Sequence, residues 1–182
     1  MKILALGAST SSTSINRRFA NFAANQIPNA EVTDLDLREI NVPIYSSDEE
    51  NINGIPVDTY RFLDLIQSHD ALVISLAEHN GSYSAAFKNI YDWVSRVEKR
   101  VWSGKPMLLL STSPGARGGA TVMEAAKATF PRMGADLKAS FSLPSFNETF
   151  SEDGGIKDGG LRSEFEAAMT AFTDALCSEY VN

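Results

Sequence analysis

KILALGASTSSTSIN, residues 2–16, joins a short apolar run to a row of hydroxyl side chains. An apolar run of about five residues that ends in glycine is typical of a strand buried on both faces of a parallel sheet. Further strands are predicted at residues 31–37, 69–77, 106–112 and 136–141. Between and after them, apolar residues recur at helical spacing at residues 14–27, 57–67, 83–100, 120–130 and 161–179.

Five strands that alternate with five helices predict a three-layer α/β domain, with a doubly wound five-stranded parallel sheet at its centre. The sequence contains neither an internal repeat nor a linker, so residues 1–182 are expected to form one domain. The proline-containing residues 42–53 and the glycine-rich residues 152–160 are predicted to be loops, the second of them exposed.

Composition excludes several classes of protein. The formal net charge is −7, which has the wrong sign for a protein that binds nucleic acid. Apolar runs such as MLLL at residues 107–110 are far shorter than the roughly 20 residues of a membrane span, and the N-terminal run is too short for a secretory signal. Cys177 is the single cysteine. We therefore expect a cytoplasmic protein with no disulfide, no metal site and no membrane contact.

The hydroxyl-rich segment after the first strand is a candidate anion site. Ligands of such sheets bind beyond the carboxyl ends of the strands, where a helix start offers unpaired amides and the positive end of its dipole. The segment lacks both the Gly-Lys-Ser/Thr of a Walker loop and the G-x-G-x-x-G of a dinucleotide fold. Two interpretations remain open from these residues alone: a phosphate cradle, or a helix start with Ser14 as its N-cap and the other hydroxyls solvated.

The spacing Ser9-x-Ser11-x-x-Ser14-x-Asn16 resembles the S-x-R-x-x-S-x-N phosphate loop of the NAD(P)H-dependent FMN reductase family. These proteins are flavodoxin-like flavoenzymes and include quinone and azo-dye reductases. The resemblance implies a sheet of order 2-1-3-4-5 and an FMN phosphate held by Ser9, Ser11, Thr13, Ser14 and Asn16. Ser11 replaces the family's arginine, so hydroxyls and the helix dipole are expected to hold the phosphate, with Arg17 or Arg18 nearby.

A second segment has a longer resemblance to the same family. Residues 78–93 resemble its P-x-Y-N-G-S-x-x-x-x-L-K-N-x-x-D-W pattern. The likeness implies that one short loop flanks the flavin ring, formed by Glu78, His79, Asn80, Gly81 and Ser82. Asn80 and Gly81 suit a tight turn that brings backbone amides toward the ring. His79 stands where the family has a stacking tyrosine, and we expect it to contact the ring and the substrate.

The third segment follows the fourth strand and resembles the family's S-x-G-x-x-G-G element. It contains Ser113, Gly115, Gly118 and Gly119, whose glycines permit the main chain to approach a ligand closely. Reduced FMN carries negative charge near N1 and O2, so amides and a helix start at this place are expected to stabilise it. Arg117 is expected to contact the phosphates of the nicotinamide nucleotide.

The resemblance implies an FMN-dependent NAD(P)H oxidoreductase that passes hydride through FMN to a quinone, a flavin or a similar small-molecule acceptor by a ping-pong mechanism. The chemistry belongs to the flavin, so no catalytic side chain is expected. The alternative is a flavodoxin-type electron carrier or another FMN-binding protein without enzymatic activity. A receiver domain and a serine hydrolase are disfavoured, because Gly7 and Ala8 replace the acidic pair and no G-x-S-x-G is present.

Two further features point to a homodimer or homotetramer. Pro43-Ile44-Tyr45 with Asp48-Glu49-Glu50 resembles the family loop that lies near the partner subunit's active site, although a plain acidic loop fits these residues equally well. In the helix at residues 83–100, Trp93 broadens the apolar stripe beyond the width that one sheet contact needs, which suggests a subunit interface. The alternative is a tryptophan partly buried within one subunit.

Overall fold

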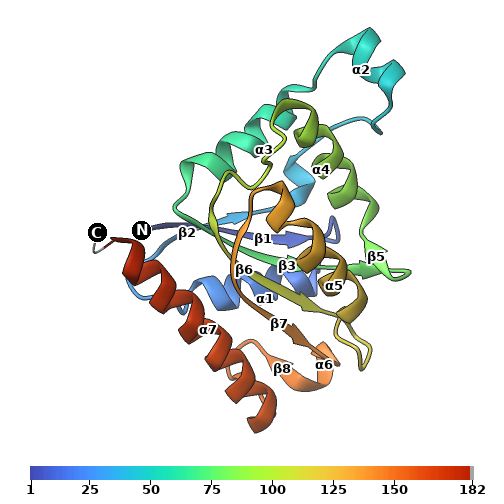
Figure 1. Cartoon of the computed structure of the whole chain (residues 1–182). Coiled ribbons are helices and arrows are strands. Elements are labelled where there is room, and N and C mark those ends of the chain that lie inside the picture. Colours follow the sequence, from blue (N-terminus) through green and yellow to red (C-terminus); the bar gives the residue numbers. More distant parts are fainter. Residues whose placement is uncertain (181–182) are drawn as a thin grey trace.

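The computed structural model describes residues 1–180 and has a parallel five-stranded sheet at its centre (Figure 1). The order of the strands is β2-β1-β3-β6-β7, which is the predicted flavodoxin-like order 2-1-3-4-5. The bounds of these strands are β1 Lys2–Ala8, β2 Glu31–Leu35, β3 Ala71–Leu76, β6 Pro106–Thr112 and β7 Asp136–Leu143.

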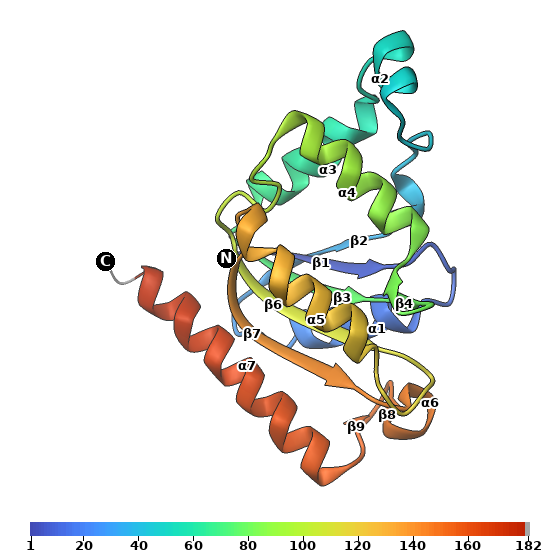
Figure 2. The ribbon, with the colours of Figure 1, turned by 45° about the vertical axis from the view of Figure 1, so that its right-hand side comes forward.

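Helices cover both faces of the sheet (Figures 1 and 2). One face carries α3 (Val57–Ser68), α4 (Ala85–Val97) and α5 (Ala120–Thr129), and the other carries α1 (Ile15–Ala24) and α7 (Gly159–Tyr180). Side chains of the strands alternate between the two cores, as Leu4 and Leu72 do on the first face and Ile3 and Val73 on the second. The predicted three-layer α/β architecture is confirmed, and within residues 1–180 no helix has the length and apolarity of a membrane span.

Short elements at the edges complete the chain. They are the 3-10 turns Leu37–Glu39 and Pro131–Met133, α2 (Ser47–Asn53), β4 (Glu78–His79), β5 (Ser82–Tyr83), α6 (Phe146–Thr149), β8 (Phe150–Ser151) and β9 (Gly155–Ile156). Most lie at the carboxyl ends of the central strands, where the candidate site was expected.

Two loop predictions were wrong. Residues 47–53 form α2, because Ser46 caps the helix by accepting a hydrogen bond from the Glu49 amide, three acids follow in its first turn, and Gly54 ends it at φ +76°. Residues 155–156 are buried and pair with β8 as β9, so residues 152–160 are not an exposed loop throughout. The predicted helix at residues 83–100 begins two residues later, after the Ser84 N-cap, and ends at Val97.

Trp93 does not mark a subunit interface. Its side chain is fully buried within the monomer, its Nε1 donates to the Pro43 carbonyl at 2.8 Å, and its ring packs edge-on against Tyr45. Asn89 also donates to Pro43, and Arg96 pairs with Glu50. Residues of α4 therefore anchor residues 43–50 of the same chain, and α2, which begins at Ser47, projects away from the sheet (Figures 1 and 2).

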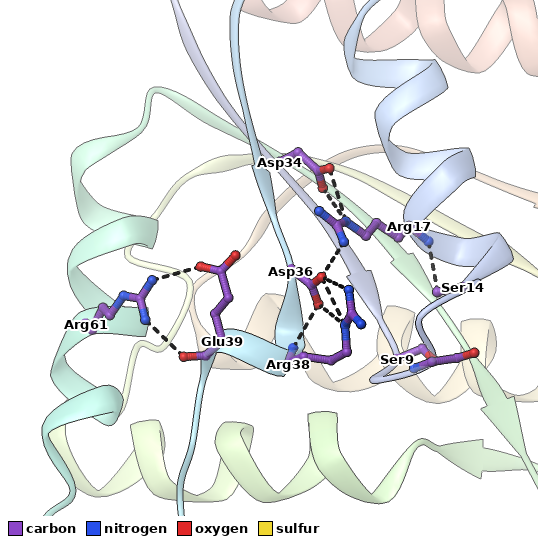
Figure 3. A network of polar contacts seen from close by, with 9 residues as sticks. Ser9, Ser14, Arg17, Asp34, Asp36, Arg38, Glu39 and Arg61 are labelled. Atoms are coloured by element: carbon purple, nitrogen blue, oxygen red, sulfur yellow. Dashed lines mark hydrogen bonds and ion pairs between the residues drawn. The ribbon is translucent and has the colours of Figure 1, made fainter.

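An ionic network fixes the first turn of α1 against β2 (Figure 3). Arg17 pairs with Asp34 and Asp36, and Arg38 pairs with Asp36 from the other side. Gly7 on β1 permits the first turn of α1 to lie close to the sheet, since a Cβ atom at Gly7 would lie 2.2 Å from the backbone nitrogen of Arg17. Hydrogen bonds from the Arg38 side chain and amide, helped by the charge of Arg17, lower the pKa of Asp36 to about 2 despite its burial.

Asp36 is expected to stabilise the fold only when it is ionised. Because its pKa is depressed in the folded state, the stabilisation is complete above about pH 4 and is lost as pH falls toward 2. We expect Asp36→Asn to lower the free energy of unfolding by about 2 kcal/mol at pH 7, and by progressively less below pH 4. Urea unfolding across this range, with exposed Asp64→Asn as the control, measures both values. A loss that is independent of pH would contradict the ionic account.

Candidate active site

The first loop, residues 9–14, meets α1 with free backbone donors. Ser14 caps the helix by accepting a hydrogen bond from the Arg17 amide at 3.1 Å, as the sequence suggested. Within residues 1–180, the amides of Thr13, Ile15 and Asn16 donate to no protein acceptor. The hydroxyls of Ser11 and Thr13 lie 3.5 Å apart and are exposed. This arrangement offers an anion several amides and hydroxyls at the positive end of a helix.

Asn16 has a structural role beside this loop. The side chain is 3% exposed, and its Oδ1 accepts hydrogen bonds from the Ser75 hydroxyl at 2.7 Å and the Thr112 amide at 3.1 Å. Its Nδ2 donates to the Thr112 carbonyl at 3.1 Å. The buried side-chain amide of Asn16 thus ties the start of α1 to the carboxyl ends of β3 and β6. The backbone N–H of Asn16 is the group that remains available to a ligand.

The second loop is a two-residue hairpin. Glu78 pairs with Tyr83 and His79 with Ser82, and the turn residues Asn80 and Gly81 have φ of +52° and +74°. Positive φ at both turn positions is the geometry of a type I′ hairpin, and Asn-Gly is the sequence that best adopts it. The predicted tight turn is confirmed. His79 is exposed at the edge of this hairpin.

The third loop, residues 113–119, is fixed by its own backbone and by β7. A Cβ atom at Gly118 would lie 2.8 Å from the backbone of Leu143, and one at Gly119 would lie 3.1 Å from the Ser111 side chain. These two glycines therefore permit internal packing. A Cβ atom at Gly115 would meet only the Ser113 hydroxyl, at 3.8 Å. The Ser113 and Gly115 carbonyls accept hydrogen bonds from the amides of residues 146 and 145, respectively.

Two more side chains tie the loops to one another. The Ser84 hydroxyl, at the start of α4, donates to the Ala8 carbonyl at 2.7 Å and so joins the second loop to the first. Glu78 Oε2 accepts a hydrogen bond from the Val122 amide at 2.9 Å and joins the second loop to the start of α5. With Asn16, these contacts hold the three loops pairwise at the carboxyl edge of the sheet.

The three loops enclose one cleft of about 240 Å³. Eight of the residues that line it were predicted as site residues: Ser9, Ser11, Thr13, Ser14, Asn16, Glu78, His79 and Ser113. The other four are Ile15, Ala77, Thr112 and Pro114. Thr112 and Pro114 were missed by sequence reasoning, although their place at the carboxyl end of a buried strand could have revealed them.

The remaining predicted residues do not line this cleft. Asn80, Gly81 and Ser82 form the outer end of the hairpin, while Gly115, Arg117, Gly118 and Gly119 lie in the third loop beyond Pro114. Arg117 is well exposed, donates to the Thr121 hydroxyl at 2.9 Å and lies 3.5 Å from Glu78.

No arginine next to the first loop faces the cleft. Arg17 is engaged by Asp34 and Asp36 (Figure 3), and Arg18 pairs with Glu152 and lies over the Phe146 ring. Both arginines do lie near the first loop, as expected, since they line a neighbouring hollow with Thr13 and Ser14. Acidic partners on β2 and beside β8 nevertheless hold both guanidinium groups away from the cleft. Glu78 is the single Asp, Glu, Lys or Arg among the residues that line the cleft.

A larger, mainly apolar hollow of about 570 Å³ lies at the opposite edge of the sheet, where the strands begin. Met1, Ile27, Asp70 and Leu176 are among the residues that line it. Ligands of doubly wound sheets bind at the other edge, beyond the carboxyl ends of the strands. Size alone therefore does not identify the site.

Several known proteins are similar to this chain. The model of the NADPH-dependent FMN reductase family matches residues 1–148. The NAD(P)H-dependent FMN reductase of Pseudomonas aeruginosa is 27% identical, over 94% of this chain and 92% of that protein. A quinone reductase of Escherichia coli is also 27% identical, over 72% of this chain and 71% of that protein.

Among solved structures, the NAD(P)H:(acceptor) oxidoreductase FerB of Paracoccus denitrificans is similar with a TM-score of 0.76 and 24% identity, over 97% of each chain. This likeness supports the flavodoxin-like fold. The family model covers all three loops, and the predicted family is confirmed. The chain belongs to the NADPH-dependent FMN reductase family.

Proposed function

We propose that this protein is an FMN-dependent NAD(P)H oxidoreductase that passes a hydride from NAD(P)H through FMN to a quinone, a flavin or a similar small acceptor. The observation that carries the proposal is the convergence of the three loops on one cleft, with free amides at one end and small side chains at the other. Membership of the family supports the same assignment.

The donor set of the first loop fits a phosphate group. The Thr13, Ile15 and Asn16 amides and the Ser9, Ser11, Thr13 and Ser14 hydroxyls would hold it at the start of α1. Ala77, His79 and Ser113 would then flank the ring, and the two small side chains would leave one face accessible. The Asn80–Gly81 turn would set the backbone of the hairpin against the ring edge.

Bound FMN supplies the hydride-accepting atom, and the protein supplies orientation and electrostatics. Tyr83 lies on β5 opposite Glu78 of β4 and is half-buried, and its hydroxyl lies 3.2 Å from that of Thr129. Burial raises the pKa of Tyr83, so the phenol stays neutral and does not serve as a base near neutral pH. Because the flavin itself accepts the hydride, the proposed reaction requires no catalytic side chain.

We propose that the side chains of Arg117 and His79 contact the nicotinamide nucleotide. Both are exposed at the mouth of the cleft, and the Arg117 guanidinium is available to a phosphate group from solvent. One open face would serve NAD(P)H and the acceptor in turn, which favours a ping-pong mechanism. A flavodoxin-type carrier is less well supported, since no Phe, Tyr or Trp lies among the twelve cleft-lining residues to shield a flavin.

We also propose that two or four copies of the chain associate in the cytoplasm. Figures 1 and 2 show α2 projecting from the body, and Ile44, Ile52 and Val57 around it are 78%, 78% and 81% exposed. Apolar side chains on such a projection are characteristic of a protein interface. A second copy of the chain is the proposed occupant, giving a homodimer or homotetramer. A single exposed cysteine suits a reducing compartment.

The function is tested by adding FMN to the purified protein and following NAD(P)H oxidation with a quinone. We expect flavin-dependent turnover and parallel double-reciprocal lines when both substrates are varied, because the first product leaves before the acceptor enters. Intersecting lines would contradict the ping-pong mechanism. Absence of flavin binding at micromolar concentrations would contradict the function itself.

The phosphate cradle is tested by removing two hydroxyls, with Ser11→Ala and Thr13→Val in one variant. FMN affinity should fall by about ten- to a hundredfold, the value of one or two hydrogen bonds to a charged group, while riboflavin affinity should change less than twofold. Fluorescence titration measures both affinities. Ser12→Ala, in the same loop but outside the cleft, is the matched control. An equal loss for both flavins would show that these hydroxyls do not contact the phosphate.

The oligomer is tested by placing charge on the projecting apolar side chains. Sedimentation equilibrium of the wild type should give a mass that is at least twice the 19.8 kDa of the chain, and Ile44→Glu with Ile52→Glu should reduce it. Thr170→Glu, at an exposed position on α7, is the control. A wild-type monomer, or a double variant that assembles normally, would contradict this interface.

A further inference from the structure

The carboxylate of Glu78 lies at the N-terminus of α5, the positive end of the helix dipole. The helix starts at Ala120 after Gly119, and no side chain of its own N-cap satisfies its first amides. Glu78 reaches across from β4 and accepts the Val122 amide at 2.9 Å through Oε2. A carboxylate in the first turn of a helix neutralises part of the positive field that the helix would otherwise present.

The charge of Glu78 is only partly balanced by its surroundings. Arg117 lies 3.5 Å from Oε1, but the Arg117 side chain is 73% exposed whereas that of Glu78 is 14% exposed. The guanidinium is therefore screened by water more strongly than the carboxylate. His79 is the adjacent titratable side chain on the hairpin, and Tyr83 opposite Glu78 is a neutral phenol. The carboxylate of Glu78 is thus the acidic group that the lining of the cleft contributes.

We propose that Glu78 lowers the reduction potential of the flavin bound in this cleft, by placing a carboxylate where the start of α5 would otherwise stabilise reduced flavin. This inference rests on the proposed function. Hydride transfer moves two electrons and one proton from NAD(P)H to FMN, giving NAD(P)⁺ and a reduced flavin with one added negative charge on its ring. A carboxylate at the cleft wall opposes that charge and leaves the oxidised, neutral ring unaffected.

The role of Glu78 differs from the one expected for α5 from sequence. A helix start in the third loop was expected to favour reduced flavin, but the structure places an anion on that helix start. Glu78 is a positioning residue as well, because the same hydrogen bond ties the hairpin to α5. Charge and position can be separated, since glutamine retains an acceptor oxygen for the Val122 amide and removes the charge.

The test is the reduction potential of bound FMN, measured at pH 7 by equilibration with a reference dye. We expect Glu78→Gln to bind reduced FMN about tenfold more tightly relative to oxidised FMN, which raises the two-electron potential by about 30 mV. Glu124→Gln removes one carboxylate from an exposed position on α5 itself and should leave the potential unchanged. Oxidised FMN should bind wild type and Glu78→Gln with equal affinity.

An unchanged or lower potential in Glu78→Gln, or an equal rise in Glu124→Gln, would overturn the inference while leaving the flavin function intact. Failure of the wild type to bind flavin would overturn the function as well. If Glu78→Gln does not fold, Arg117→Gln serves as the second variant, since it removes the partner that balances Glu78. It should lower the potential, and an unchanged or higher value would contradict the proposal.

Discussion

The side-chain amide of Asn16 is the contact on which the site depends. It is buried and makes three hydrogen bonds, one with the Ser75 hydroxyl and two with the backbone of Thr112, so it fixes the first turn of α1 against β3 and β6 at once. An unsatisfied polar group at this depth costs about 1–3 kcal/mol, and the loss of Asn16 would leave three such groups. Ser84 and Glu78 then complete the connections among the three loops. Polar side chains thus join the walls of the cleft to one another, and backbone hydrogen bonds from residues 145 and 146 hold its third loop.

This construction explains why a site without a catalytic side chain can still direct a reaction. The amides at the start of α1 fix one end of a ligand, while Ala77 and Ser113 leave the other end open. Charge in the cleft comes mainly from Glu78, because Arg17 and Arg18 are held by acids outside it. On the proposed function, the protein acts on a flavin through orientation and through the field of one carboxylate, and the projecting α2 segment is the proposed contact between subunits.

Much of this arrangement could be predicted from local patterns. Apolar runs gave the strands and their order followed from the family resemblance, and Asn80-Gly81 specified its turn by conformational preference alone. α2 was missed although Ser46-x-x-Glu49 is a capping signature, because a proline-containing acidic stretch outweighed it. The partners of Asn16, Trp93 and Arg17 could not be predicted, since they are reached through tertiary contacts. Asn16 and Thr112 are 96 residues apart, and nothing near either residue specifies the other.

The central claim is that three tied loops hold FMN with its phosphate on the first of them. A crystal structure of the protein soaked with FMN tests this most directly. The account predicts phosphate oxygens within about 3 Å of the Thr13, Ile15 and Asn16 amides, and the ring between residues 77–79 and 113–114. Flavin density in the apolar hollow beside Met1 and Leu176, or a phosphate turned to solvent with the first loop unchanged, would contradict it.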